Sequence, residues 1–197
     1  MMDSVKVLIS GYARKQHSGK WDATSMTVLV RSAGKLVLVD PGCRPDELAA
    51  ALQKEGLDAV DIDLVVNTHS HYDHTRNSRL FPKDRVLNLY QTPAKLQPEP
   101  WYVPGTDIKV VYTPGHADKH IALLVETEAG TYAVAGDVFW WEDGEEQQAD
   151  IESLLRHPDP VGKDPAQLQK SRKKLLELAD YVIPGHGTTF RVPGKQQ

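Results

Sequence analysis

Hydrophobic residues in the first part of the chain fall into short apolar runs that are separated by polar turns. Runs over residues 5–9, 26–30 and 35–39 are rich in valine, leucine and isoleucine, and Ser32-Ala33-Gly34 joins the last two. Runs of this length, bounded by turn residues, are typical of β-strands. The pattern predicts an antiparallel set of strands near the N-terminus.

The pattern changes to a helical one in two later segments. Residues 45–54 have a proline at the start, early acidic residues, alanines and a closing glycine, and residues 164–179 carry an apolar stripe with proline in the first turn. Both segments are predicted helices. Further strands are predicted over residues 62–66, 85–90, 108–112, 121–126, 131–135 and 181–183. This order of elements predicts an α/β (α+β) protein with two sheets and helices outside them.

Length and composition indicate one ordinary globular domain over residues 1–197, with 40% hydrophobic and 25% charged residues. The net charge of −4 is not typical of a protein that coats polyanions. Cys43 is the single cysteine, which excludes an internal disulfide and a multi-cysteine zinc ribbon. No signal-peptide pattern and no apolar run of about 18 residues is present, so we expect a cytoplasmic protein without a membrane partner.

Three of the eight histidines lie within six residues, in the segment His69-Ser70-His71-Tyr72-Asp73-His74. The segment directly follows the predicted strand 62–66, at a place where α/β sheets commonly bind ligands. Crowded imidazoles and a carboxylate are costly when they are buried without partners, whereas a divalent cation binds each lone pair. The alternative is a set of polar side chains in surface loops. The crowding favours a metal site.

Three more candidate ligands occupy similar positions at predicted strand ends. His116 follows strand 108–112, Asp137 lies at the end of strand 131–135, and His186 follows strand 181–183. Seven nitrogen and carboxylate ligands are too many for one tetrahedral ion, but they fit two ions that share a bridging carboxylate. A ligand set without thiolate suits zinc, and iron and manganese also fit. We therefore expect two divalent metal ions, with zinc favoured.

The pattern His-x-His-x-Asp-His, followed by a lone His, an Asp and a C-terminal Gly-His-Gly, resembles the metallo-β-lactamase superfamily over essentially the whole chain. The resemblance implies a four-layer αββα sandwich. It also implies that His69, His71 and His116 bind one metal, that Asp73, His74 and His186 bind the other, and that Asp137 bridges them. Asp40, in the turn Val39-Asp40-Pro41-Gly42, would orient a metal ligand. Asp73 would also hold or transfer a proton as the catalytic carboxylate.

The resemblance implies a hydrolase that uses a metal-bridging hydroxide on a small ester, thioester, lactone or similar substrate. A true β-lactamase is disfavoured, because Asp137 is present and a signal peptide is not. Short segments around Leu80, Asp137 and His186 also resemble a branch of small single-domain members whose animal representative processes histone pre-mRNA. A metal-dependent endoribonuclease or phosphodiesterase with RNA as partner is therefore one alternative. A persulfide dioxygenase with a single iron and a metal-stabilised binding module are two others.

Several residues outside the ligand set have an open role in the sequence. Arg76 and Trp140 are predicted to contact the substrate, while an outward ion pair and simple packing are their respective alternatives. Residues 11–21 fit either a mobile flap over the site or a hairpin loop. The remaining histidines, which are expected at the surface or in packing, are His17, His120 and His157. The basic stretch 170–174 and the acidic stretch 142–146 are expected to be solvated. No periodic apolar seam indicates an oligomeric state.

Overall fold

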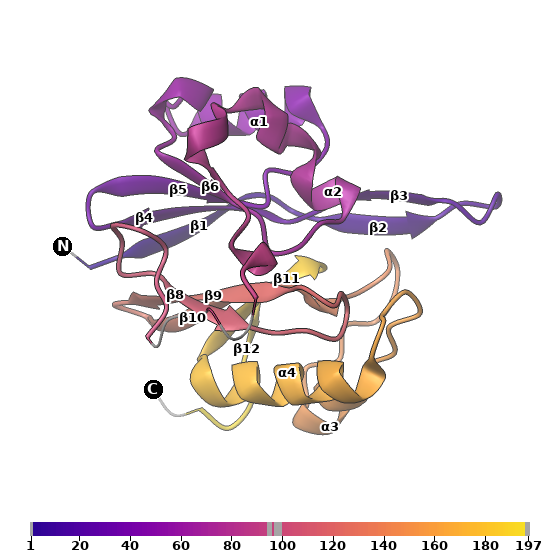
Figure 1. Ribbon diagram of the computed structural model, residues 1–197. Coiled ribbons are helices and arrows are strands. Elements are labelled where there is room, and N and C mark those ends of the chain that lie inside the picture. Colours follow the sequence, from indigo (N-terminus) through magenta and orange to yellow (C-terminus); the bar gives the residue numbers. More distant parts are fainter. Residues whose placement is uncertain (1, 94–95, 97–99, 196–197) are drawn as a thin grey trace.

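Two β-sheets face one another at the centre of the molecule, and helices cover the outer face of each sheet (Figure 1). The computed structural model describes residues 2–93, 96 and 100–195. Helix α1 (Pro45–Lys54) lies on the sheet formed by the earlier part of the chain, and α4 (Pro165–Leu178) lies beneath the other sheet. The expected four-layer αββα sandwich is confirmed.

The first sheet contains strands from residues 4–87. In spatial order they are β1 (Ser4–Ile9), β4 (Thr27–Ser32), β5 (Lys35–Val39), β6 (Leu64–Val66) and β7 (Val86–Leu87). Strands β1, β4 and β5 are antiparallel neighbours, whereas β5, β6 and β7 are parallel. Because the parallel strands end at one edge of the sheet, the polar residues Asp40 and Asn67 that follow β5 and β6 come out there together.

The second sheet contains strands from residues 109–191. In spatial order they are β12 (Phe190–Arg191), β11 (Tyr181–His186), β10 (Gly130–Trp140), β9 (Ile121–Thr127) and β8 (Lys109–Tyr112). All neighbours are antiparallel except β10 and β11, which are parallel. A separate hairpin of β2 (Tyr12–Lys15) and β3 (Trp21–Thr24) extends away from the first sheet (Figure 1). Residues 11–21 therefore form most of a paired hairpin.

The remaining helices are short. They are α2 (Tyr72–Thr75), α3 (Ile151–Arg156) and the 3-10 turns Ala59–Asp61, Arg76–Leu80, Lys83–Arg85 and Leu89–Gln91. The sequence pattern did not predict α3, whose N-cap Asp150 accepts a hydrogen bond from the Ser153 amide at 3.0 Å. No helix in the described part of the chain is long and apolar enough to cross a membrane.

Alternating side chains of the strands supply both faces of the first sheet. Val28 and Val30 of β4 belong to the core between the sheets, whereas Leu29 belongs to the core beneath α1. Strand β5 repeats the pattern, with Val37 inside and Leu38 under the helix. Full burial of each such side chain contributes about 1.5–3 kcal/mol. The period-two pattern therefore fixes which face of the sheet meets the second sheet.

Three predicted strands differ from the structure by three or more residues. The strand predicted over residues 181–183 continues as β11 to His186, so this histidine lies within the strand and not after it. In residues 85–90 only Val86 and Leu87 pair with β6, because Asn88 leaves the extended conformation at φ −93° and ψ 58° and begins a 3-10 turn. Strand β10 does not end at residue 135 but continues to Trp140. Gly136, at φ 50°, shifts the register in a left-handed conformation and lets the strand go on. Asp137 therefore lies within a strand and not after one.

Candidate functional site

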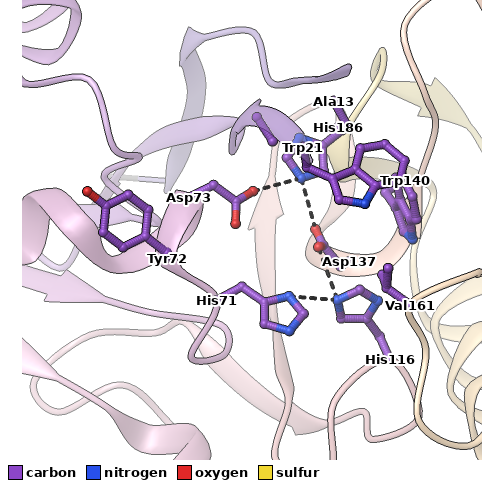
Figure 2. A pocket seen from close by; sticks show the side chains of 11 residues that line it. Ala13, Trp21, His71, Tyr72, Asp73, His116, Asp137, Trp140, Val161 and His186 are labelled. Atoms are coloured by element: carbon purple, nitrogen blue, oxygen red, sulfur yellow. Dashed lines mark hydrogen bonds and ion pairs between the residues drawn. The ribbon is translucent and has the colours of Figure 1, made fainter. Parts of the chain in front are cut away.

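The structure brings all seven predicted ligand residues together at the edge where the two sheets meet. They form two groups, in each of which one ligand atom from every residue lies within 4.8 Å of the others. The first group is His69, His71, His116 and Asp137, and the second is Asp73, His74 and His186. His69 and His71 lie between β6 and α2, Asp73 and His74 lie in α2, His116 follows β8, and Asp137 and His186 belong to β10 and β11. Figure 2 shows several of these side chains converging on one pocket.

Asp137 contacts histidines of both groups, and each of its carboxylate oxygens faces a different pair of histidines. Its Oδ2 atom lies 3.2 Å from His116 Nε2 and 3.6 Å from His69 Nε2. Its Oδ1 atom lies 3.1 Å from His74 Nε2 and 3.7 Å from His186 Nε2. A carboxylate in this position can bridge two bound ions.

Hydrogen bonds on the far side of the imidazoles fix their orientation. Asp40 accepts hydrogen bonds from the Thr68 amide at 2.7 Å and the Thr68 hydroxyl at 2.6 Å, and its Oδ2 atom lies 2.8 Å from His74 Nδ1. Because a carboxylate only accepts, His74 Nδ1 donates. The Thr68 hydroxyl donates its hydrogen bond to Asp40, so it accepts a hydrogen bond from His69 Nδ1 at 3.0 Å. With Nδ1 of each histidine committed to these hydrogen bonds, Nε2 is the nitrogen left to bind a metal, and the Nε2 atoms of both histidines face the carboxylate of Asp137.

The side chains of the two groups do not fully satisfy one another by hydrogen bonds, and their arrangement suits the binding of divalent cations. The buried atoms His69 Nε2, His74 Nε2 and Asp137 Oδ1 form no well-directed hydrogen bond with a described residue. His116 Nε2 faces His71 Nδ1 at 3.0 Å. Unpaired buried polar atoms cost about 1–3 kcal/mol each, and a cation would bind these lone pairs. Imidazole and carboxylate donors suit zinc, iron or manganese.

Electrostatics keep the central carboxylate ionised. Burial raises the pKa of Asp137, but His74, His186 and His116 outweigh it and hold the pKa well below the usual range. Burial lowers the pKa of His69 well below its ordinary value, so this imidazole is neutral. Burial also opposes the charge of His116, but Asp137 and Asp159 raise its pKa to about 9. Burial opposes the charge of His74 too, but Asp137, Asp40 and Asp73 raise its pKa well above the ordinary value, so a metal must displace a proton from both His74 and His116 at neutral pH.

A pocket of about 270 Å³ opens in front of the two groups (Figure 2). Its polar side is formed by His71, Asp73, His116, Asp137 and His186, and its other walls by Ala13, Trp21, Ala23, Tyr72, Trp140 and Val161. Trp21, from the β2–β3 hairpin, meets Trp140 edge to face with ring centres 5.6 Å apart. No lysine or arginine is among these lining residues. The pocket is thus apolar apart from the His/Asp groups.

The two predicted substrate residues occupy different positions. Trp140 lines the pocket, whereas Arg76 does not, and its guanidinium carbon lies 5.2 Å from the centre of the Tyr72 ring. Substrate contact by either residue stays a prediction. The neighbouring Trp141 packs in the core beside Phe190, with ring centres 5.9 Å apart.

Three residues next to the site were not among the predicted functional residues. Thr68 orients His69, and its place directly before that histidine is a signal that the sequence offers. His120 is fully buried and stacks on His69 with ring centres 4.8 Å apart, in keeping with a packing role. Asp159 lies 2.7 Å from His116 Nδ1 and is separated from it by 43 residues, so no sequence spacing indicates the contact.

Comparisons with known proteins define the family. The profile described as the metallo-beta-lactamase superfamily matches residues 20–101. Metallo-beta-lactamase domain-containing protein 1 of Xenopus laevis is 37% identical over 203 residues, which cover 96% of this chain and 82% of the frog protein. The chain belongs to the metallo-β-lactamase superfamily, and with its His/Asp metal site it is a metallo-hydrolase of that superfamily.

Solved structures agree with the fold. A quorum-quenching N-acyl homoserine lactone hydrolase superposes with a TM-score of 0.64 at 19% identity, covering 94% of this chain and 93% of that one. A likeness at this identity bears on the fold alone. A second protein, solved in a di-iron-bound form, is 26% identical with a TM-score of 0.56 and covers 85% of this chain and 89% of that one. The two His/Asp groups are consistent with a dinuclear metal site.

Proposed function

We propose that this protein is a dinuclear zinc hydrolase that cleaves an ester, thioester or lactone bond in a small molecule. The observation that carries the proposal is an apolar pocket whose polar side is formed by two His/Asp groups joined through Asp137. The proposal includes a single domain over residues 1–197 and a cytoplasmic location, in keeping with the single cysteine.

Each ion has its own set of ligands in this proposal. One ion would be held by His69, His71 and His116, the other by Asp73, His74 and His186, and Asp137 would be shared. Bound there, two divalent cations would lower the pKa of a shared water and polarise the substrate oxygen. The hydrogen bonds with Asp40 and Thr68 already orient His74 and His69, so the two rings need little movement to bind a metal.

Asp73 is the residue of the chain best placed to move a proton. It lines the pocket, and its Oδ2 atom lies 3.2 Å from His186 Nε2. Burial raises the pKa of Asp73, but His74 and the hydrogen bond from His186 outweigh it and lower the pKa. An ionised carboxylate at the pocket surface can accept the proton of an attacking water and return it to the leaving group.

The pocket walls favour an uncharged acyl substrate. Trp21, Trp140 and Val161 offer apolar surface beside the polar side, which holds an acyl chain and excludes water. Phosphodiester recognition commonly uses arginine or lysine, and neither lines this pocket. The basic side chains of Lys109, Lys170 and Lys174 line a different groove that shares no residue with the site.

A substrate panel with a metal count tests the proposal. Zinc-loaded protein is assayed with p-nitrophenyl acyl esters, an acyl thioester, an N-acyl lactone and bis-p-nitrophenyl phosphate, beside Asp137→Asn and the control Glu146→Gln, an exposed carboxylate outside the pocket. We expect the largest kcat/KM on an acyl substrate, its loss in Asp137→Asn and no change in the control.

Three outcomes contradict the proposal and identify the alternative. A larger kcat/KM on the phosphodiester, together with salt-sensitive RNA binding, favours a nuclease. A single iron per chain with persulfide-dependent oxygen uptake favours a dioxygenase. Unfolding on metal removal without hydrolysis of any panel member favours a binding module.

A further inference from the structure

The segment between α3 and α4, residues 157–164, is bound to the loop that carries His116. The Lys163 amide donates to the carbonyls of Gly115 and His116 at 2.9 and 3.2 Å, and the Asp164 amide donates to Gly115 at 2.8 Å. We call residues 157–164 the clasp segment.

Asp159 is the member of the clasp segment that contacts a metal-site histidine. Its Oδ2 atom lies 2.7 Å from His116 Nδ1, and only 4% of its side chain is exposed. Its Oδ1 atom accepts a hydrogen bond from the Val161 amide at 3.2 Å. Because the carboxylate only accepts, His116 Nδ1 donates, which leaves Nε2 as the nitrogen that would bind a metal once its proton is displaced. Asp159 thus joins a metal-site histidine to Val161, which forms a wall of the pocket.

Hydrogen bonds of Arg172 and His157 connect the clasp segment to β10 beyond Asp137. Arg172 of α4 is 2% exposed, and it donates to Val138 through Nε at 2.9 Å and to the His157 carbonyl through Nη1. The imidazole of His157 contacts the Trp140 carbonyl through Nε2 at 2.9 Å. The carboxylate of Asp159 is therefore held in place by the same strand that supplies Asp137.

We propose that Asp159 is a positioning residue that fixes the tautomer and direction of His116 for the first metal ion, as Asp40 does for His74 and the second. The inference rests on the proposed dinuclear site. Each carboxylate contacts a histidine of a different group. Asp40 lies 2.8 Å from Nδ1 of His74 in the second group, and Asp159 lies 2.7 Å from Nδ1 of His116 in the first. Each ion therefore has one carboxylate that orients a histidine ligand.

Competition with a chromophoric zinc chelator tests the proposal, with wild type, Asp159→Asn and the control Asp164→Asn compared. Asp164 lies in the same segment and caps α4 by accepting from the Gln167 amide at 2.9 Å, a role that asparagine also fills. We expect Asp159→Asn to bind one of two zinc ions about 10–100-fold more weakly and to retain the other. The control should match wild type, and the d–d spectrum of bound Co²⁺ should change in Asp159→Asn alone.

The outcomes separate this inference from the proposed function. Wild-type affinity for both ions in Asp159→Asn overturns the inference and leaves the dinuclear site standing. Failure of the wild type to bind two ions overturns both. If Asp159→Asn does not fold, Gly162→Ala replaces it, because an added Cβ would lie 2.9 Å from Asp159 Cγ and displace the carboxylate without removing it. The same weaker binding of one zinc ion is then expected, and unchanged affinity for both ions overturns the inference.

Discussion

Substitution of Gly115 by alanine tests whether His116 is placed by close packing of its loop on α4. Gly115 has φ 134°, a conformation that side-chain-bearing residues rarely adopt. An added Cβ would lie 2.3 Å from both Cα and N of Leu168, which belong to the backbone of α4 and cannot rotate away. The loop or the helix must therefore move.

The structure gives the expected magnitude. Overpacking against fixed atoms costs about 1–3 kcal/mol, and a backbone conformation confined to glycine costs about 1–3 kcal/mol more. The free energy of unfolding of Gly115→Ala should therefore fall by about 4 kcal/mol. With a urea m-value of about 2 kcal/mol/M, the midpoint of unfolding falls by about 2 M.

Urea denaturation of metal-free protein measures this effect without a contribution from metal binding. The matched control is Gly56→Ala, because Gly56 has φ 69° but nothing within 4 Å of an added Cβ. The control carries only the left-handed strain, about 1–2 kcal/mol. Equal shifts of the midpoint in the two variants would refute the packing argument, and so would a Gly115→Ala variant with wild-type stability.

Three further predictions concern the pocket, the metals and the basic groove. Trp21→Ala removes about 1.5–3 kcal/mol of apolar contact, so kcat/KM for an acyl ester should fall about 10-fold or more while the metal count stays unchanged. When free zinc is at 100 times the Kd of a site, removal of that ion by a chelator should lower the melting temperature by about 5–10 °C. Added zinc should restore the melting temperature in a thermal-shift assay. Lys170→Glu combined with Lys174→Glu should leave acyl hydrolysis unchanged in the same kinetic assay, because both residues lie outside the pocket.

Much of the fold follows from the sequence because the periodic segments are also the buried ones. The strand over residues 35–39 and the helix over residues 45–54 begin and end as predicted. Strand β10 was predicted too short because Gly136 has the signature of a strand end. In the folded chain Thr68 and His120 pack directly against Gly136, and the strand continues through its left-handed conformation. A contact between distant segments decides this boundary, and local pattern does not contain it.

The sequence predicts the residues of the metal site, but it does not predict all of the residues that orient them. The histidines and aspartates of the two groups are identified by motif order, and the structure gathers them in the two predicted sets. Asp159 sits in an unremarkable Pro-Asp-Pro segment, and its function arises only where α4 brings residues 157–164 against His116. Charge and spacing along the chain do not reveal such a partner, because the contact is tertiary.

The most direct test of the dinuclear site is a count of bound metal ions in the purified protein, beside Asp137→Ala and the exposed control Glu146→Ala. Elemental analysis after expression with ample metal should find two ions per chain in the wild type and the control. It should find one or none in Asp137→Ala, because Asp137 contacts both groups of ligands. No bound metal in the wild type, or two ions retained without Asp137, would contradict the dinuclear site.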